Sequence, residues 1–285
     1  MLAVGTCAAT ACLLEVTARK PGNVHRFRDF DDATFLDFLL SAAALGPCLE
    51  NVGERGVGAT VLEIIRRTRQ LVATNTNLGI ALLLTPLAAV PRSQSIAGGI
   101  QSVLKRLTLE DSVAVFEAIR LAKPGGLGRA PDQDVAEQPT KPLREVMALA
   151  ADHDLVARQY ADGYKAVLRT GVPSLLHGWS MGWPLEKAIV YCHVDLMAQF
   201  PDSLIARKRS HEEALKATEL ASRARATIDR AMPTRESLKE LDRWLTAIGH
   251  ERNPGTTADL VTASLFVALR EGLITLPLDR PWAMD

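Results

Sequence analysis

Apolar residues recur at three- and four-residue spacing over most of the chain, which is the pattern of helices that bury one face. Short alternating runs of apolar and polar residues, which would indicate β-strands, are nearly absent from the sequence. The pattern therefore predicts an all-α protein. We expect helices at residues 2–19, 32–45, 57–73, 78–89, 95–106, 109–122, 142–170, 184–199, 211–231, 235–249 and 257–273.

Proline and glycine separate many of these helices, because proline lacks an N–H and restricts the residue before it. The predicted breaks lie at residues 20–22, 46–47, 123–126, 171–173 and 253–255. Side chains that can cap a helix start by accepting free backbone N–H groups follow several breaks. The predicted capping pairs are Ser210 with Glu213, Thr108 with Asp111, and Thr256 with Asp259.

The segment at residues 123–141 is the longest polar, breaker-rich stretch, and it is a candidate linker between two domains. Helices of similar composition flank it on both sides, so we favour a surface loop over one compact multi-helix domain spanning residues 1–285. Loops of this length in compact domains are often functional.

Charge and composition narrow the classes of partner. Lys plus Arg and Asp plus Glu both total 33, so the chain lacks the basic field of most nucleic-acid binders. No run reaches the roughly 18 apolar residues that would span a membrane. The apolar N-terminus has no cationic start, and the 4 cysteines form no CxxC pair. We expect a cytoplasmic protein with reduced thiols.

Glu15 lies in an otherwise apolar helix, so packing that helix would remove its carboxylate from water. Such burial is costly unless a cation or hydrogen-bond donors compensate. One interpretation is contact with a metal ion or a substrate ammonium group. The other is a salt bridge at the helix end to Arg19 or Lys20, and the sequence does not decide between them.

The next expected helix carries three polar candidates near its start. Asp32 is placed to cap the helix, and that role alone would explain it. Asp37 and Ser41 lie four residues apart on one helical face among phenylalanine and leucine. A buried hydrogen-bonded pair is the favoured interpretation of these two residues.

Four polar residues, Thr74 to Asn77, directly precede an apolar helix. The free N–H groups and dipole of a helix N-terminus favour phosphate binding. An ordinary cap explains one of these residues but not four, so we expect Asn75 or Asn77 to contact a ligand.

Two later segments combine acids with cations or with helix starts. Asp202, Arg207 and Lys208 could serve a phosphate and its magnesium ion, although solvated helix-end charges are the alternative. Capping explains Thr256 and Asp259. Of the remaining candidates, Asp154 and Arg158 are expected to form a surface ion pair, His153 and Asp152 to lie at a site edge, and His177 and His193 to be structural.

Taken in order, these segments resemble the triphosphoribosyl-dephospho-CoA synthase family over almost the whole chain. Five matched loops in sequence are far more specific than any one of them. The matching pieces are Glu15 with Lys20-Pro21-Gly22, Asp32 followed by Ser41, Asn75-Thr76 with Gly79, the Asp202 loop, and NPGTTADL at 253–260.

The resemblance implies an all-α enzyme that uses ATP and 3′-dephospho-CoA, releases adenine and joins the triphosphoribosyl group to the ribose 2′-hydroxyl of the acceptor. It implies catalytic roles for Glu15, Asp32, Asp202 and Asp259, and magnesium binding by Glu15, Asp32 and Asp202. The implied ligand-binding residues are Lys20, Asn23, Ser41, Asn75, Thr76, Asn77 and Lys208, with the two lysines contacting phosphates.

Two departures from the family pattern bear on activity. The family commonly reads NTHKG where this chain has NTNLG, so a His and a Lys are missing at Asn77 and Leu78. The Arg-Gly-Glu-Ala segment of the family is replaced at residues 157–164. Two alternatives therefore stay open, a transferase acting on another acceptor in cofactor biosynthesis and a non-catalytic nucleotide- or cofactor-binding helical protein. A homo-oligomer also stays open.

Overall fold

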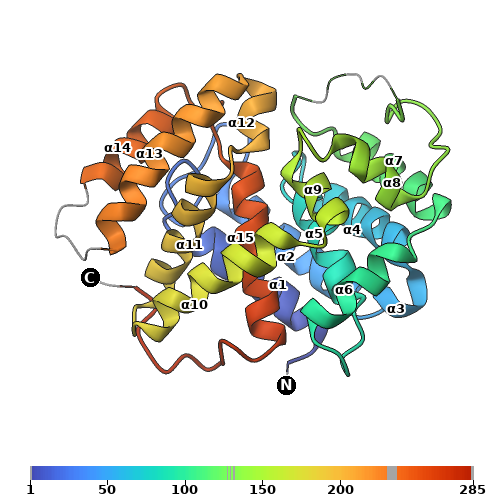
Figure 1. Cartoon of the computed structure of the whole chain (residues 1–285), viewed down its shortest axis with the longest axis horizontal. Helices are drawn as coiled ribbons and strands as arrows, with labels where there is room; N and C mark the ends of the chain where they lie inside the picture. The colour runs from blue at the N-terminus through green and yellow to red at the C-terminus, as the bar shows by residue number, and fades with distance from the viewer. Residues whose placement is uncertain (1, 127, 129, 131, 230–235, 284–285) are drawn as a thin grey trace.

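The computed structural model describes residues 2–126, 128, 130, 132–229 and 236–283, and the described chain forms helices and no strand (Figure 1). The all-α prediction is therefore confirmed. None of the described helices is long and apolar enough to cross a membrane. The elements are α1 (Val4–Thr17), α2 (Phe35–Leu49), α3 (Val52–Arg55), α4 (Val57–Leu71), α5 (Leu78–Ala88), α6 (Ile96–Lys105), α7 (Leu109–Ala122), α8 (Leu143–Ala150), α9 (Leu155–Asp162), a π-helical turn (Val167–Gly171), α10 (Val172–Ser180), α11 (Leu185–Gln199), α12 (Ser203–Lys208), α13 (His211–Asp229), α14 (Glu236–Thr246) and α15 (Gly255–Arg270).

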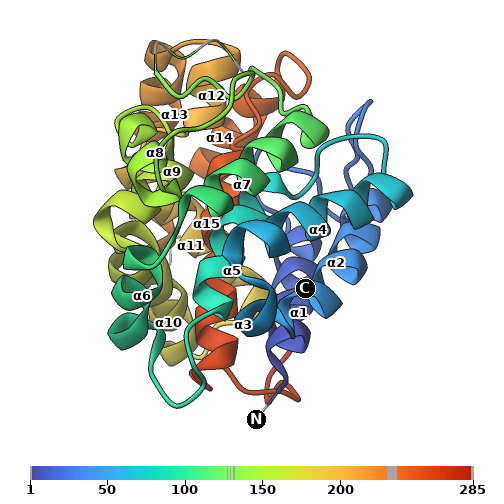
Figure 2. The same ribbon diagram turned by 90° about the vertical axis from the view of Figure 1, so that its right-hand side faces the viewer.

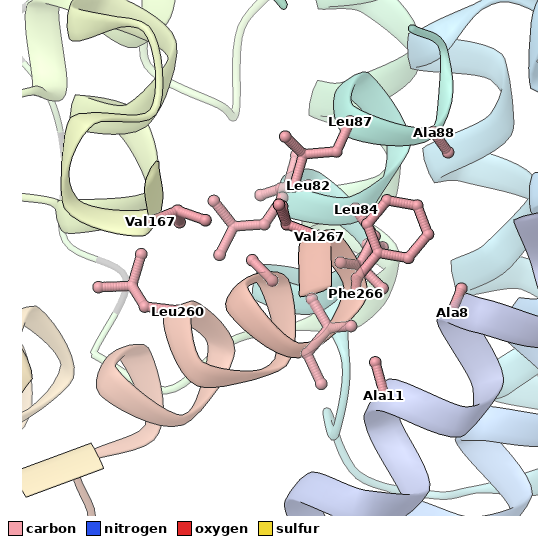
Figure 3. Close-up of a cluster of buried hydrophobic side chains, with 14 of the residues drawn as sticks. Ala8, Ala11, Leu82, Leu84, Leu87, Ala88, Val167, Leu260, Phe266 and Val267 are labelled. Atoms are coloured by element: carbon pink, nitrogen blue, oxygen red, sulfur yellow. The ribbon is translucent and has the colours of Figure 1, made fainter. Parts of the chain in front are cut away.

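Helix α15 runs through the middle of the molecule in both views, with α1, α5, α10 and α11 packed around it (Figures 1 and 2). Its side chains from Leu260 to Arg270 are buried on every face, as expected of a central helix. Phe266 and Val267 meet Leu84 and its neighbours on α5 and the small residues of α1 (Figure 3). Burial of this apolar surface is the main source of stability.

A second, smaller apolar cluster joins α11, α13 and α14. It includes Val194 and Met197 of α11 together with Leu241 and Leu245 of α14. Because α11 contributes to both clusters, it fixes the α13–α14 hairpin against the central helix.

Helices α1 and α2 pack so closely that only glycine fits at their crossing. A Cβ atom on Gly5 would lie 2.2 Å from the carbonyl oxygen of Gly46. This close approach fixes the start of α1 against the last turns of α2.

Most helix ranges agree with the prediction, and the range 109–122 with its Thr108–Asp111 capping box is confirmed to the residue. The expected break at 46–47 is wrong, because Pro47 lies in the last turn of α2, which continues to Leu49. The expected break at 171–173 is also wrong. There the chain changes from a π-helical turn to α10, and Pro173 stands at the start of α10, where its missing N–H costs nothing.

The single helix expected at 142–170 is divided in the structure. Asp154 caps a new helix start by accepting the N–H groups of Val156 and Ala157, and Gly163 ends α9 with a φ of 77°. Helix α10 was not predicted, because breaks were expected at residues 171–173. The short helices α3 and α12 were not predicted either, since four and six residues carry too little periodicity to be recognised.

Candidate functional site

A cavity of about 850 Å³ opens between the N-terminal ends of α5 and α15, the end of α12, and the walls formed by α7 and α8. Its size lies within the range of small-molecule sites. Described residues of the long segment after α7 line it as well, among them Lys123, Asp132 and Val135. The described part of this segment therefore lies at a cavity, which fits the expectation that a loop of this length is functional.

Glu15 lies in the cavity wall although only 4% of its surface is exposed. The ammonium of Lys20 lies 2.9 Å from Glu15 Oε1, so the salt bridge considered from the sequence is present. Burial raises the pKa of Glu15, and the Lys20 charge opposes that rise. The two interpretations of Glu15 are thus compatible, because it is paired with Lys20 and also faces the cavity.

Lys20 lies behind the cavity wall. Its side chain is fully buried, and Nζ donates to the carbonyl oxygens of Glu15 at 2.5 Å and Ala18 at 3.3 Å besides contacting the Glu15 carboxylate. An ammonium group has three hydrogens, and three acceptors surround this one. Lys20 therefore has no free N–H group for the phosphate contact that the family resemblance implies.

Asp259 lies just after the first turn of α15, which begins at Gly255, and lines the cavity. The predicted capping pair with Thr256 is wrong, because the helix begins at Gly255 after Pro254 and has no side-chain cap. Thr256 instead accepts a hydrogen bond of 3.0 Å from the Ser203 hydroxyl. Among the residues the structure describes, none donates a hydrogen bond to the Asp259 carboxylate.

The Asp259 carboxylate lies directly against the first turn of α5. A Cβ atom on Gly79 would come within 2.0 Å of Asp259 Oδ2, so glycine is required there. Burial raises the pKa of Asp259 well above its usual value, and the nearby Glu15 and Asp202 charges raise it further. The Arg207 charge opposes this rise, and the carboxylate, which is partly exposed, lines the cavity.

Asp202 has the opposite surroundings. Its Oδ1 accepts the N–H groups of Leu204 at 2.9 Å and Ile205 at 3.1 Å, and its Oδ2 accepts the N–H and hydroxyl of Thr257 at 2.7 and 2.8 Å. It is fully buried and does not belong to the cavity lining. Burial raises the pKa of Asp202, while these hydrogen bonds lower it. Asp202 ties the start of α12 to the start of α15.

The N-terminus of α2 differs from the prediction. Thr34, not Asp32, is the N-cap, and it forms a capping box with Asp37. Asp32 stays 58% exposed at the cavity, with His250 Nε2 3.6 Å away. Asp37 and Ser41 are hydrogen-bonded, but Ser41 donates to the Asp37 backbone oxygen at 2.7 Å, while the Asp37 carboxylate accepts the Thr34 N–H.

The four polar residues before α5 all line the cavity. Asn75, two residues before the N-cap residue Asn77, accepts the Leu78 N–H at 3.1 Å. The Thr76 hydroxyl bonds that of Ser41 at 2.5 Å, which places Ser41 behind the cavity wall. Asn77 donates to Thr68 Oγ1 at 2.9 Å, while its Oδ1 is buried without a partner among the described residues. That oxygen is available to a ligand.

The cations of the cavity come from two segments that pack together. Lys123, Arg207 and Lys208 all line it. Gly126 has a φ of 72°, and a Cβ atom there would lie 3.1 Å from Arg207 Cβ. The turn at Gly125-Gly126 therefore packs directly on the end of α12. Lys123 was not predicted as a site residue, because Arg207 and Lys208, which line the cavity with it, lie some 80 residues away in the sequence.

Several interactions fix the loop between α1 and α2, which carries Asn23 and Asp32 to the cavity. Buried Glu186 of α11 accepts hydrogen bonds from Arg19 at 2.9 Å and Arg26 at 2.8 Å. Asp242 of α14 binds Arg28 at 2.6 Å. Sequence reasoning missed both acids, because neither has a partner nearby in the chain.

The predicted pair of Asp154 and Arg158 is wrong. Asp154 caps α9 and forms its ion pair with Arg207, whereas Arg158 donates to the Ala151 carbonyl oxygen at 2.9 Å. His193 is fully buried, with Nε2 3.4 Å from the amide nitrogen of Asn23, and burial lowers its pKa to about 3. It is neutral at physiological pH.

The described residues contain no group of three His, Cys, Asp or Glu side chains positioned to hold a metal ion. The predicted set of Glu15, Asp32 and Asp202 is therefore not assembled as a metal centre. Acids nevertheless outnumber cations in the described cavity lining. The acids are Glu15, Asp32, Asp132, Asp134, Asp154 and Asp259, against Lys123, Arg207 and Lys208.

Comparison with known proteins agrees with this architecture. The family model CitG, described as ATP:dephospho-CoA triphosphoribosyl transferase, matches residues 1–276. A crystal structure from Archaeoglobus fulgidus, provisionally named a triphosphoribosyl-dephospho-CoA synthase, is 32% identical with a TM-score of 0.64, covering 82% of this chain and 99% of that one. No curated protein matches the sequence. The chain belongs to the ATP:dephospho-CoA triphosphoribosyl transferase family.

Proposed function

We propose that this protein transfers the triphosphoribosyl group of ATP to 3′-dephospho-CoA with release of adenine. Family membership over residues 1–276 supports the reaction class. The observation that carries the proposal is the Asp259 carboxylate, which lies in the NPGTTADL segment and faces the cavity without a hydrogen-bond donor among the described residues. A protein retained only for its scaffold would have no reason to keep such a costly group.

The triphosphate is proposed to lie along the cationic segments. The sequence suggested the N-terminus of α5, but the Asp259 carboxylate lies against Gly79 there and would repel a phosphate. Lys123, Arg207 and Lys208 offer charge-assisted hydrogen bonds where the segment after α7 packs on the end of α12. This placement gives the chain a phosphate site that does not depend on a lysine at position 78.

Magnesium is proposed to accompany the triphosphate. A polyanion in a cavity where acids outnumber cations requires added positive charge. Mg²⁺ keeps several waters and takes one or two carboxylates plus phosphate oxygens. Asp32 fits this role, because it is 58% exposed, whereas Lys20 occupies one oxygen of Glu15 and four hydrogen bonds fill Asp202.

Asp259 is proposed as the general base. The bond between ribose C1′ and adenine N9 breaks with its electron pair leaving on adenine, and the acceptor 2′-oxygen forms the new bond to C1′. The hydroxyl proton passes to Asp259, and adenine takes up a proton from solvent. A carboxylate with a raised pKa is a stronger base near neutral pH. The negative charge of Glu15 stabilises the cationic ribosyl centre.

The test is to incubate the protein with Mg²⁺, ATP and 3′-dephospho-CoA, measure free adenine by chromatography and identify the product by its mass. We expect adenine and the triphosphoribosyl product in equal amounts, with no adenine when the acceptor is left out. Tight ATP binding without adenine release would support the non-catalytic alternative. Adenine formed only with other acceptors would show that the acceptor is wrong.

A further inference from the structure

The salt bridge between Lys20 and Glu15 is buried from water, yet one of its two members lines the cavity. We infer that Lys20 is a positioning residue that acts through Glu15, holding its carboxylate ionised and fixed in the cavity wall. The inference rests on the proposed function, in which that negative charge faces the ribosyl centre.

The geometry around Lys20 excludes direct contact with a ligand. Its Nζ is surrounded by Glu15 Oε1 at 2.9 Å and by the carbonyl oxygens of Glu15 and Ala18 at 2.5 and 3.3 Å. Lys20 is absent from the cavity lining, while Glu15 belongs to it. The effect of Lys20 on a bound nucleotide must therefore pass through Glu15.

The backbone that carries Lys20 is held rigidly. The Lys20 N–H donates to the Ala18 carbonyl oxygen at 2.8 Å, and the following Gly22 has a φ of 75°. The Gly22 N–H donates to Asp242 Oδ1 at 2.9 Å, and a Cβ atom on Gly22 would lie 2.7 Å from Leu245 Cδ1. The Lys-Pro-Gly turn thus fixes the ammonium group relative to α1 and α14.

Lys20 is the group that supplies positive charge to Glu15, because the other ionisable groups described around the pair are either acidic or neutral near pH 7. Asp259 of α15 adds a second negative charge, and burial raises the pKa of the Cys12 thiol on α1. His193 of α11 and His25 of the loop both have lowered pKa values, about 3 and about 4, and are neutral near pH 7. Removing the Lys20 charge would leave Glu15 desolvated beside another acid.

The variant Lys20→Met tests the inference through the pH profile of adenine release. Without the ammonium group, the pKa of Glu15 should rise, so the acid limb of the kcat profile should move to higher pH by at least about 1 unit. The KM for ATP should change little, because Lys20 touches no phosphate. An unmoved acid limb with a raised KM for ATP would overturn the inference and restore the direct phosphate contact.

A stability cycle keeps the test independent of activity. Lys20→Met should lower the melting temperature strongly, because it leaves a buried charge without a partner, and the double variant Lys20→Met/Glu15→Gln should melt above it. Additive effects of the two substitutions would overturn the pairing. If the wild-type protein releases no adenine, the proposed function fails, whereas the cycle still reports whether Lys20 holds Glu15 ionised.

Discussion

Helices α12 and α15 each follow or carry an aspartate from a segment that resembles the family, and the Asp202 carboxylate ties the starts of the two helices together. Asp202 accepts four hydrogen bonds and does not line the cavity. Asp259 accepts none from the described residues and faces the cavity. The same residue type thus serves structure in one segment and is left for a ligand in the other.

This difference shows that resemblance to a family motif does not by itself separate the two roles. The separation comes from counting the hydrogen-bond donors that each carboxylate meets. A carboxylate that is largely removed from water and meets no donors lowers stability, and proteins commonly accept such a cost at functional sites. Substitution of Asp202 should therefore mainly lower stability, whereas substitution of Asp259 should mainly lower activity.

The largest expected effect is on stability at the start of α12. Asp202→Asn turns an acceptor into a donor that faces backbone N–H groups, and we expect a loss of about 3 kcal/mol in the free energy of unfolding. Asp259→Asn should leave that free energy unchanged or raise it while reducing adenine release. Urea denaturation of both variants measures the contrast. Equal destabilisation would mean that Asp259 is also a structural residue.

A second prediction moves the Asp259 carboxylate without replacing it. Gly79→Ala would place a methyl group 2.0 Å from Asp259 Oδ2, so the carboxylate must shift. A misplacement of about 1 Å can cost roughly 100-fold in rate, and we expect kcat for adenine release to fall on that order. Gly53→Ala is the matched control, since its Cβ atom meets nothing within 4 Å.

Gly79→Ala should cause no further loss in a protein that already carries Asp259→Asn. Full activity of Gly79→Ala would show that the exact position of the carboxylate is unimportant.

The smallest expected effect concerns the cationic segments. Lys123→Ala should raise the KM for ATP by roughly tenfold with a smaller change in kcat, because it removes one charge-assisted contact to phosphate. Lys105→Ala is the control, since Lys105 is exposed on α6 and outside the cavity lining. Equal KM values for the two variants would remove Lys123 from the phosphate site.

The helices could be predicted because their apolar periodicity is local in the sequence. Errors arose at Pro47 and Pro173, where a proline lies in the last or first turn of a helix and costs little. Three candidate site residues chosen from the sequence, Glu15, Asn75 and Asn77, do line the cavity.

The roles of individual site residues could not be predicted, because they depend on distant partners. Two of the four hydrogen bonds to Asp202 come from Thr257, which lies 55 residues away. Asp259 was explained as a cap from its spacing to Thr256, and the explanation failed because the helix begins at Gly255. Lys123 entered the site only through contacts between its loop and α12.

Chemical rescue tests the role of Asp259 most directly. Asp259→Ala removes the carboxylate and leaves space that opens to the cavity, so added formate can take its place, whereas the fully buried Asp202 position is closed to it. The measurement is adenine release by Asp259→Ala and Asp202→Ala over a range of formate concentrations. We predict that formate restores activity to Asp259→Ala alone; rescue of neither variant, or of both equally, would contradict the account.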